Sequence, residues 1–203
     1  MCGFTGYINK PNKKTIKNMT DTIKHRGPDS EGFYIDDFIA LGFRRLAIID
    51  IKNGNQPLYS YDKNYIICFN GEIYNYLELK KELLKLGHKF KTKTDTEVLL
   101  NGFIEYGPNI LNKLRGMFAF IIYDKKNKKL FGARDIFGIK PFYYYLKNKD
   151  FIFGSEIKSF LKNKNFNKKL NEKVLKNYLT FQYSPVEETF FKIFVKRSAL
   201  YCS

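Results

Sequence analysis

The 203-residue sequence is poor in cysteine and contains no long apolar run. Its three cysteines, Cys2, Cys68 and Cys202, are widely spaced, which predicts neither a disulfide framework nor a zinc site. No apolar run reaches the length of about 18 residues that a membrane-spanning helix needs. The segment from Met1 to Phe4 lacks the basic flank and apolar core of a secretory signal. These absences predict an intracellular, cytoplasmic protein without a membrane partner.

Arginine is also scarce, since only six of the 36 basic residues are Arg. The 36 basic and 20 acidic residues give a formal net charge of +16, which suggests nucleic-acid binding. However, Arg is the residue that reads guanine and phosphate through paired hydrogen bonds. The lysines are scattered, often beside Asn, as in residues 125–129 and 162–165. We therefore interpret the charge as a solvated Lys-rich surface, with general polyanion attraction as the alternative, and expect no specific nucleic-acid partner.

The chain is 44% hydrophobic and has 20 Phe and 15 Tyr, enough to fill a sizeable core. Short apolar or alternating runs predict strands at Gly3–Ile8, Gly32–Ile35, Ile39–Phe43, Tyr65–Phe69, Met117–Tyr123, Lys129–Arg134, Phe142–Leu146 and Phe151–Ser155. Amphipathic or capped segments predict helices at Thr15–His25, Leu77–Leu86, Thr94 to about Tyr106, and Asn171–Leu179. Thr94 and Glu97 match a reciprocal capping box. Strands, two helices and further strands together indicate an α+β fold.

Cys2 is the first residue that suggests chemistry. Methionine aminopeptidases remove Met1 when the next residue is small, which would place a thiol and a free α-amine on Cys2. The amine has an ordinary pKa of about 7.7–8.0 and the thiol about 8.5, so the amine can accept the thiol proton near neutral pH. This arrangement needs no histidine, and the chain has two. A second-position cysteine is usually incidental, so the hypothesis depends on other segments.

Four further segments carry polar residues into turns and strand ends: His25–Asp29, Arg44–Asp50, Asn70–Asn75 and the region of Asp95. Each also has a purely structural interpretation. Asn70-Gly71 is typical of a hairpin turn, Arg45 can pair with a surface carboxylate, and Asp95 can favour a helix N-terminus. Their order and combination favour a functional interpretation over these separate ones.

In that order, the segments resemble a class II glutamine amidotransferase. The segments that carry the resemblance are Cys2-Gly3, His25–Asp29, Arg45–Asp50, Asn70–Asn75, Thr94–Val98, Gly116–Phe120, Arg134–Pro141 and Ser155–Lys158. The chain resembles the N-terminal glutaminase half of glutamine-hydrolysing asparagine synthetases over about residues 2–191, and Asn70–Asn75 discriminates it from other amidotransferases. The resemblance implies an N-terminal nucleophile hydrolase fold, a four-layer αββα sandwich of two antiparallel sheets flanked by helices. It places a glutamine amidotransferase domain at residues 2–186.

The resemblance also implies roles for single residues. Cys2 would attack the side-chain amide of L-glutamine to give ammonia and a thioester, which water would hydrolyse to glutamate. Asn70 and Gly71 would form the oxyanion hole and would be catalytic with Cys2. Arg45 would hold the α-carboxylate of glutamine, and Asp95 with Glu72 its α-ammonium. The complete implied glutamine-binding set is Arg45, Leu46, Ala47, Ile48, Ile49, Asn70, Gly71, Glu72 and Asp95, with no metal and no cofactor in this domain.

The sequence contains no Ser-Gly-Gly-x-Asp-Ser loop and no G-x-x-x-x-G-K-[ST] loop. The ATP and Mg that the family uses to amidate aspartate would therefore belong to a missing synthetase domain. Residues 187–203 are expected to form a truncated connector, because 193–203 departs from the family pattern. A synthetase domain or chain that consumes ammonia is the expected partner, and a homodimer is left open.

Three interpretations remain at this level. The first is a glutaminase with a free N-terminal Cys2, the second an inactive truncated remnant that acts at most as a binding or assembly module, and the third a nucleic-acid-binding protein. We favour the first. We expect His25 and Asp29 to order a loop, Arg134 and Asp135 to brace the fold through a salt bridge, and Cys68 to lie in the core.

Overall fold

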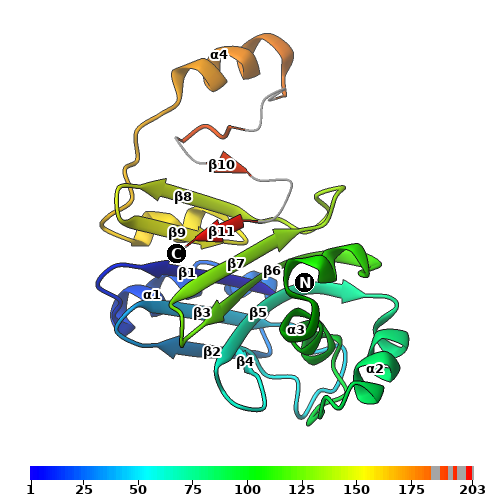
Figure 1. Cartoon of the computed structure of the whole chain (residues 1–203). Helices are drawn as coiled ribbons and strands as arrows, with labels where there is room; N and C mark the ends of the chain where they lie inside the picture. Colours follow the sequence, from blue (N-terminus) through cyan, green and yellow to red (C-terminus); the bar gives the residue numbers. More distant parts are fainter. Residues whose placement is uncertain (184–187, 192–193, 196–199, 203) are drawn as a thin grey trace.

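Two antiparallel β-sheets face each other in the computed structural model, which describes residues 1–183, 188–191, 194–195 and 200–202 (Figure 1). One sheet contains β1 (Gly3–Ile8), β2 (Ser30–Ile35), β3 (Ile39–Arg45), β8 (Tyr143–Lys147), β9 (Asp150–Gly154) and β10 (Phe194–Val195), in the spatial order β10-β8-β9-β1-β3-β2. The other contains β4 (Leu58–Tyr59), β5 (Tyr65–Ile73), β6 (Gly116–Asp124), β7 (Lys129–Arg134) and β11 (Leu200–Cys202), in the order β11-β7-β6-β5-β4.

Helices cover the outer face of each sheet. Helix α1 (Lys13–Asp21) and the 3-10 helix η3 (Ile157–Lys162) pack on the sheet that contains β1. Helices α2 (Tyr76–Lys85) and α3 (Asp95–Tyr106) pack on the sheet that contains β5. Two short 3-10 helices, η1 (Lys24–Arg26) and η2 (Gly107–Asn112), and helix α4 (Glu172–Phe181) complete the described helices. None of the helices in the described ranges has the length and apolar character needed to cross a bilayer.

Three apolar clusters fill the spaces between these four layers. The cluster between the sheets includes Phe4, Phe43, Ile121, Phe142 and Phe153. The cluster beneath α2 and α3 includes Leu79, Leu83, Leu99, Phe103 and Phe120, and that beneath α1 includes Tyr7, Ile16, Met19, Ile152 and Phe160. Cys68 is completely buried in the cluster between the sheets, as predicted. The layer order confirms the predicted α+β class and four-layer αββα sandwich.

The N-terminus of α3 confirms one half of the predicted capping box. The Thr94 hydroxyl accepts a hydrogen bond from the Glu97 amide at 3.2 Å. The reciprocal half is wrong, because the Glu97 carboxylate accepts from the amides of Lys91 at 2.8 Å and Thr92 at 2.6 Å instead. This buried carboxylate therefore fixes the loop before α3 in place.

The helix predicted at Thr15–His25 is shorter than expected. Helix α1 ends at Asp21, and a 3-10 turn follows at Lys24–Arg26. The hydroxyl of Thr22 donates back to the Met19 carbonyl at 2.7 Å, a local bond that competes with helix continuation.

Arg134 and Asp135 do brace the fold, but the predicted salt bridge is absent from the ion pairs of the described residues. Arg134 donates instead to the carbonyl oxygens of Gly138 and Lys140. Asp135 accepts from the amides of Ile139 and Lys140, at 2.9 and 3.0 Å. Both side chains thus hold the loop between β7 and β8 through its backbone.

The C-terminal segment contributes one edge strand to each sheet. Phe194–Val195 pairs with β8, and Leu200–Cys202, for which the sequence predicts no element, pairs with β7. The predicted domain boundary between residues 186 and 187 lies outside the described residues and stays a prediction.

Candidate active site

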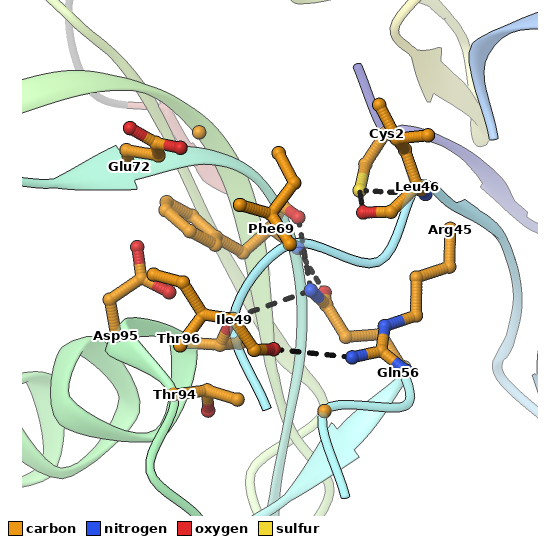
Figure 2. Close-up of a pocket in the computed structure, with 13 residues that line it drawn as sticks. Cys2, Arg45, Leu46, Ile49, Gln56, Phe69, Glu72, Thr94, Asp95 and Thr96 are labelled. Atoms are coloured by element: carbon orange, nitrogen blue, oxygen red, sulfur yellow. Dashed lines mark hydrogen bonds between the residues drawn. The ribbon is translucent and has the colours of Figure 1, made fainter. Parts of the chain in front are cut away.

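A pocket opens where the start of β1, the loop after β3, strand β5 and the N-terminus of α3 meet (Figure 2). Its walls come from segments that are far apart in the sequence. The lining residues are Cys2, Arg45, Leu46, Ile48, Ile49, Gly54, Gln56, Phe69, Gly71, Glu72, Thr94, Asp95 and Thr96.

Cys2 immediately precedes β1 and is half-buried at one side of this pocket. Its Sγ lies 3.4 Å from the Leu46 carbonyl oxygen and 3.3 Å from the Leu46 amide nitrogen. Burial raises the pKa of the thiol, while the Leu46 N–H and the positive charge of Arg45 oppose that rise. The thiol is therefore protonated at neutral pH and needs a base before it can act as a nucleophile.

Arg26 holds the backbone on the other side of Cys2. Its Nε donates to the Cys2 carbonyl oxygen at 3.0 Å, and its Nη1 donates to the Glu156 carboxylate at 3.0 Å. His25 contacts the same carboxylate at 2.7 Å. Gly3 leaves room for this arginine, because a Cβ at Gly3 would lie 2.8 Å from Arg26 Cδ and would push the Arg26 side chain aside. The turn that includes His25 thus orders the chain around Cys2, in agreement with its predicted structural role.

The peptide groups of Gly71 face the pocket rather than the neighbouring strand. Gly71 is the register partner of Phe118 on β6. The Phe118 amide and carbonyl are bonded on the opposite side, to Asp135, at 3.2 and 2.8 Å. Because directly opposed residues in an antiparallel pair alternate between bonded and non-bonded sites, Gly71 and Phe118 occupy a non-bonded site. The Gly71 N–H and carbonyl consequently point away from β6, towards the pocket.

Asn70 lies next to this glycine and is 1% exposed. Side chains alternate along a strand, so Asn70 faces the same side of β5 as Cys68, which is the inter-sheet side against which Cys2 also packs. Among the described residues its Nδ2 has no hydrogen-bond partner. A buried amide donor of this kind is costly unless a ligand oxygen satisfies it.

Arg45 lies at the end of β3 and is 6% exposed. Its Nη1 donates to Ile51 O at 2.7 Å and to Asn55 Oδ1 at 3.1 Å. Its Nη2 donates to Asp50 O at 2.8 Å and to Ile49 O at 3.3 Å. These four bonds use all four terminal guanidinium hydrogens and organise the loop after β3. A carboxylate that binds Arg45 through two parallel hydrogen bonds must displace part of this set.

Asp95 and Glu72 place negative charge in the pocket, on the side away from Cys2 and Arg45 in Figure 2. Asp95 is 5% exposed, and its Oδ2 accepts from the Ile73 amide at 3.0 Å. Burial raises the pKa of Asp95 to about 6, and the nearby Glu72 carboxylate also raises it. The carboxylate is thus ionised at neutral pH at an energetic cost that a bound cation would offset.

The structure brings most of the predicted site residues together. Eight of them line the pocket: Cys2, Arg45, Leu46, Ile48, Ile49, Gly71, Glu72 and Asp95. Asn70 is buried directly beside it, whereas Ala47 is not among the lining residues and donates its amide to the Asp29 carboxylate at 2.8 Å. The sequence analysis did not assign five further lining residues to the site, namely Gly54, Gln56, Phe69, Thr94 and Thr96. The described residues bring no three His, Cys, Asp or Glu side chains together as metal ligands.

Comparison with known proteins places this geometry in context. A family model described as the glutamine amidotransferase domain matches residues 1–199. The chain is 47% identical over 196 residues to the glutamine-hydrolyzing asparagine synthetase 1 of Bacillus subtilis (strain 168), covering 93% of this chain and 31% of that protein. It is 43% identical over 168 residues to asparagine synthetase 3 of the same organism, covering 79% and 27%. The chain therefore spans about a third of the length of the curated relatives it matches.

A solved structure shares the fold. The glutamine phosphoribosylpyrophosphate amidotransferase from B. subtilis, complexed with ADP and GMP, superposes with a TM-score of 0.67. The match covers 78% of this chain and 43% of that chain at 23% identity. At this identity the likeness establishes the arrangement of sheets and helices and nothing about ligands.

Proposed function

Because the chain belongs to the glutamine amidotransferase domain family, we propose that it hydrolyses L-glutamine to glutamate and ammonia at the pocket that contains Cys2. The observation that carries this proposal is that one pocket combines a thiol, an inward-facing glycine N–H, one buried cation and two carboxylates. A free amino acid carries one negative and one positive group, and this set offers a counter-charge for each.

Before catalysis, an aminopeptidase removes Met1, which leaves the free α-amine on Cys2. The amine accepts the thiol proton, and the thiolate attacks the side-chain amide carbon of glutamine. Collapse of the tetrahedral intermediate breaks the C–N bond, and the departing nitrogen takes a proton and leaves as ammonia. A water then attacks the thioester, and glutamate leaves as the Cys2 thiol is restored. The raised pKa of the thiol is the reason that a neighbouring base is needed.

The oxygen of each tetrahedral intermediate carries negative charge. The Gly71 N–H points into the pocket, and the Asn70 amide Nδ2 has no partner among the described residues. Both are donors already in place before charge develops, which is the requirement for an oxyanion hole. We assign the oxyanion to these two donors.

Substrate orientation follows from the charges. The α-carboxylate of glutamine binds Arg45 by replacing carbonyl contacts of the loop after β3, and the α-ammonium binds Asp95 and Glu72. Leu46, Ile48 and Ile49 form the wall between these groups. Ala47 shapes the same loop through its bond to Asp29. This pairing holds the amide in front of the thiol, where positioning supplies much of the rate.

Ammonia is useful only where a second reaction consumes it. The relatives that this chain matches are named as glutamine-hydrolyzing asparagine synthetases, and the chain covers 31% and 27% of the first two. We therefore assign the ATP-dependent amidation of aspartate, with its ATP and Mg, to a synthetase domain or chain outside these 203 residues. The glutaminase half-reaction itself requires no cofactor, and we place it in the cytoplasm.

The test is glutamate release from glutamine by protein whose Met1 has been removed, as verified by mass spectrometry. Wild type is expected to release glutamate and Cys2→Ala to release none, while the matched Cys68→Ala variant retains activity because Cys68 is buried between the sheets. Equal release by wild type and Cys2→Ala would overturn the proposal. Absence of release by mature wild type would favour an inactive remnant that serves as a binding or assembly module.

A further inference from the structure

The ladder between β4 and β5 ends before it reaches the pocket. Leu58 pairs with Ile67 and Tyr59 with Ile66. Continuing the same register towards the pocket places Gln56 opposite Phe69 and Gly54 opposite Gly71. Strand β4 has only two residues, so its backbone does not supply partners at these positions. The pocket end of β5 therefore needs another group to hold its edge.

The side chain of Gln56 supplies that group (Figure 2). Its Nε2 donates to the Phe69 carbonyl at 3.1 Å, and its Oε1 accepts from the Phe69 amide at 2.6 Å. Gln56 is 9% exposed, so water does not compete strongly for these bonds. A side-chain amide has the same donor and acceptor as a peptide group, and here it takes the place of the next residue of the ladder. A weaker contact of 3.4 Å joins Nε2 to Thr96 Oγ1 at the start of α3.

This pairing fixes the direction of the peptide groups that follow. Phe69 bonds to Gln56 on the edge of β5 that faces away from β6. Peptide direction repeats every second residue along a strand, so the Gly71 N–H points to the same edge. There the opposing residue, Gly54, donates its own amide to the Asp50 carbonyl at 2.9 Å and does not continue the ladder. Gln56 is thus the last ladder contact before the glycine N–H that faces the pocket.

We propose that Gln56 is a positioning residue of the glutaminase reaction, which fixes the edge of β5 at Phe69 and thereby aims the Gly71 N–H at the reacting oxygen. This inference rests on the proposed function. It assigns Gln56 no contact with the substrate, so its loss should act on the transition state more than on glutamine binding.

The test compares Gln56→Asn and Gln56→Met with Gln182→Asn in the full chain after Met1 removal. Asn is one methylene too short for the paired bonds, and Met keeps the length of the side chain without them. Gln182 is an exposed residue after α4 with a positive φ of 60°, which Asn accepts, so it is a matched control. Both Gln56 variants are expected to lower kcat by about 10- to 100-fold with KM within about threefold of wild type, since misplacement by about 1 Å costs this much.

A second measurement separates aiming of the N–H from collapse of the pocket. Alkylation of Cys2 by iodoacetamide displaces iodide and forms no oxyanion, so its rate should stay within about twofold of wild type in variants that keep the thiol in place. Lower kcat with unchanged alkylation supports the proposal. Unchanged kcat, a rise in KM alone, or a parallel loss of alkylation overturns it. If mature wild type releases no glutamate, the proposed function itself fails and the inference falls with it.

Discussion

One residue, Leu46, contacts the Cys2 thiol with both its donor and its acceptor, the amide nitrogen 3.3 Å and the carbonyl oxygen 3.4 Å from Sγ. The loop after β3 therefore sets the position of the thiol and also biases its protonation. Arg45 fixes that loop through four hydrogen bonds, so the nucleophile and the cationic residue of the pocket share one structural support.

The first prediction concerns the reactivity of Cys2 in protein that retains Met1. Burial raises the pKa of the thiol, so the rate of iodoacetamide alkylation should still be rising above pH 8.5, the region of about half-ionisation for a free cysteine. Peptide mass mapping across pH 6–10 measures this rate, with buried Cys68 as an internal control that stays unlabelled. A plateau below about pH 8.5 would contradict the raised pKa.

Asp95→Asn is predicted to make the protein more stable at pH 7. Burial raises the pKa of Asp95 to about 6, so the folded protein holds this proton more tightly than the unfolded chain does. Stability is therefore lost as pH rises from about 4 to 6, by about 1–3 kcal/mol in total, and the neutral amide avoids that loss. Urea unfolding should show the gain at pH 7 and its disappearance below about pH 4. Asp37→Asn, at a carboxylate 76% exposed, should show no comparable gain.

The same carboxylate gives a prediction for substrate binding. Protonation of Asp95 removes the charge that faces the α-ammonium, so KM for glutamine should rise as pH falls through about 6. On this acidic limb of the pH profile, KM should change by about tenfold per pH unit where the curve is steepest. Asp95→Asn should have a high KM at every pH and lack this limb. A limb that persists in the variant would assign the titration to another group.

Arg45→Lys is predicted to lower kcat/KM by about 100-fold or more. Lysine has one ammonium and cannot make the four loop contacts and a paired carboxylate contact together. The loss should appear in both KM and kcat, because the same loop holds Cys2 Sγ through Leu46. Steady-state kinetics with Arg115→Lys, an exposed arginine, provides the comparison. Equal effects of the two substitutions would show that the planar, two-pronged geometry of the Arg45 guanidinium does not matter for kcat/KM.

Gly71→Ala is predicted to destabilise the fold by about 1–3 kcal/mol and to lower kcat by about 100-fold. A Cβ at Gly71 would lie 2.3 Å from the Met117 carbonyl oxygen and 2.7 Å from Phe118 Cα, both backbone atoms of β6. The strands must separate to admit it, which moves the N–H that faces the pocket. Gly87→Ala should cost about 1 kcal/mol, because its φ is +92°, and should leave kcat unchanged. Unfolding curves and kinetics of both variants test the contrast.

Much of the fold could be predicted from the spacing of apolar residues along the chain and from the residues at which helices begin and end. The strand predicted at Gly3–Ile8 coincides with β1, and the helix from Thr94 to Tyr106 coincides with α3 and ends before Gly107, whose φ is 58°. Errors occur where polar side chains compete locally. Thr22 helps to end α1 early, and Glu97 bonds to the preceding loop instead of completing the capping box.

The reactive and charged residues of the pocket could be predicted from the sequence, whereas the residues that hold them in position could not. Cys2, Arg45 and Asp95 belong to segments whose residue types already suggest chemistry. Gln56 does not, because its function depends on the register between β4 and β5, which no local pattern encodes. The direction of the Gly71 N–H likewise depends on which side of Phe118 is bonded, a property of three strands together.

Cys2 immediately precedes β1 of one sheet and Gly71 lies in β5 of the other, so the aromatic layer between the sheets helps to set the gap between nucleophile and oxyanion donor. Phe4, Phe43, Phe142 and Phe153 therefore act as a spacer whose thickness matters to the reaction as well as to folding. Replacing one of these four phenylalanines by a much smaller side chain would loosen the packing of one sheet on the other while each sheet kept its own hydrogen bonds. On warming, such a variant should lose turnover at a lower temperature than it loses secondary structure.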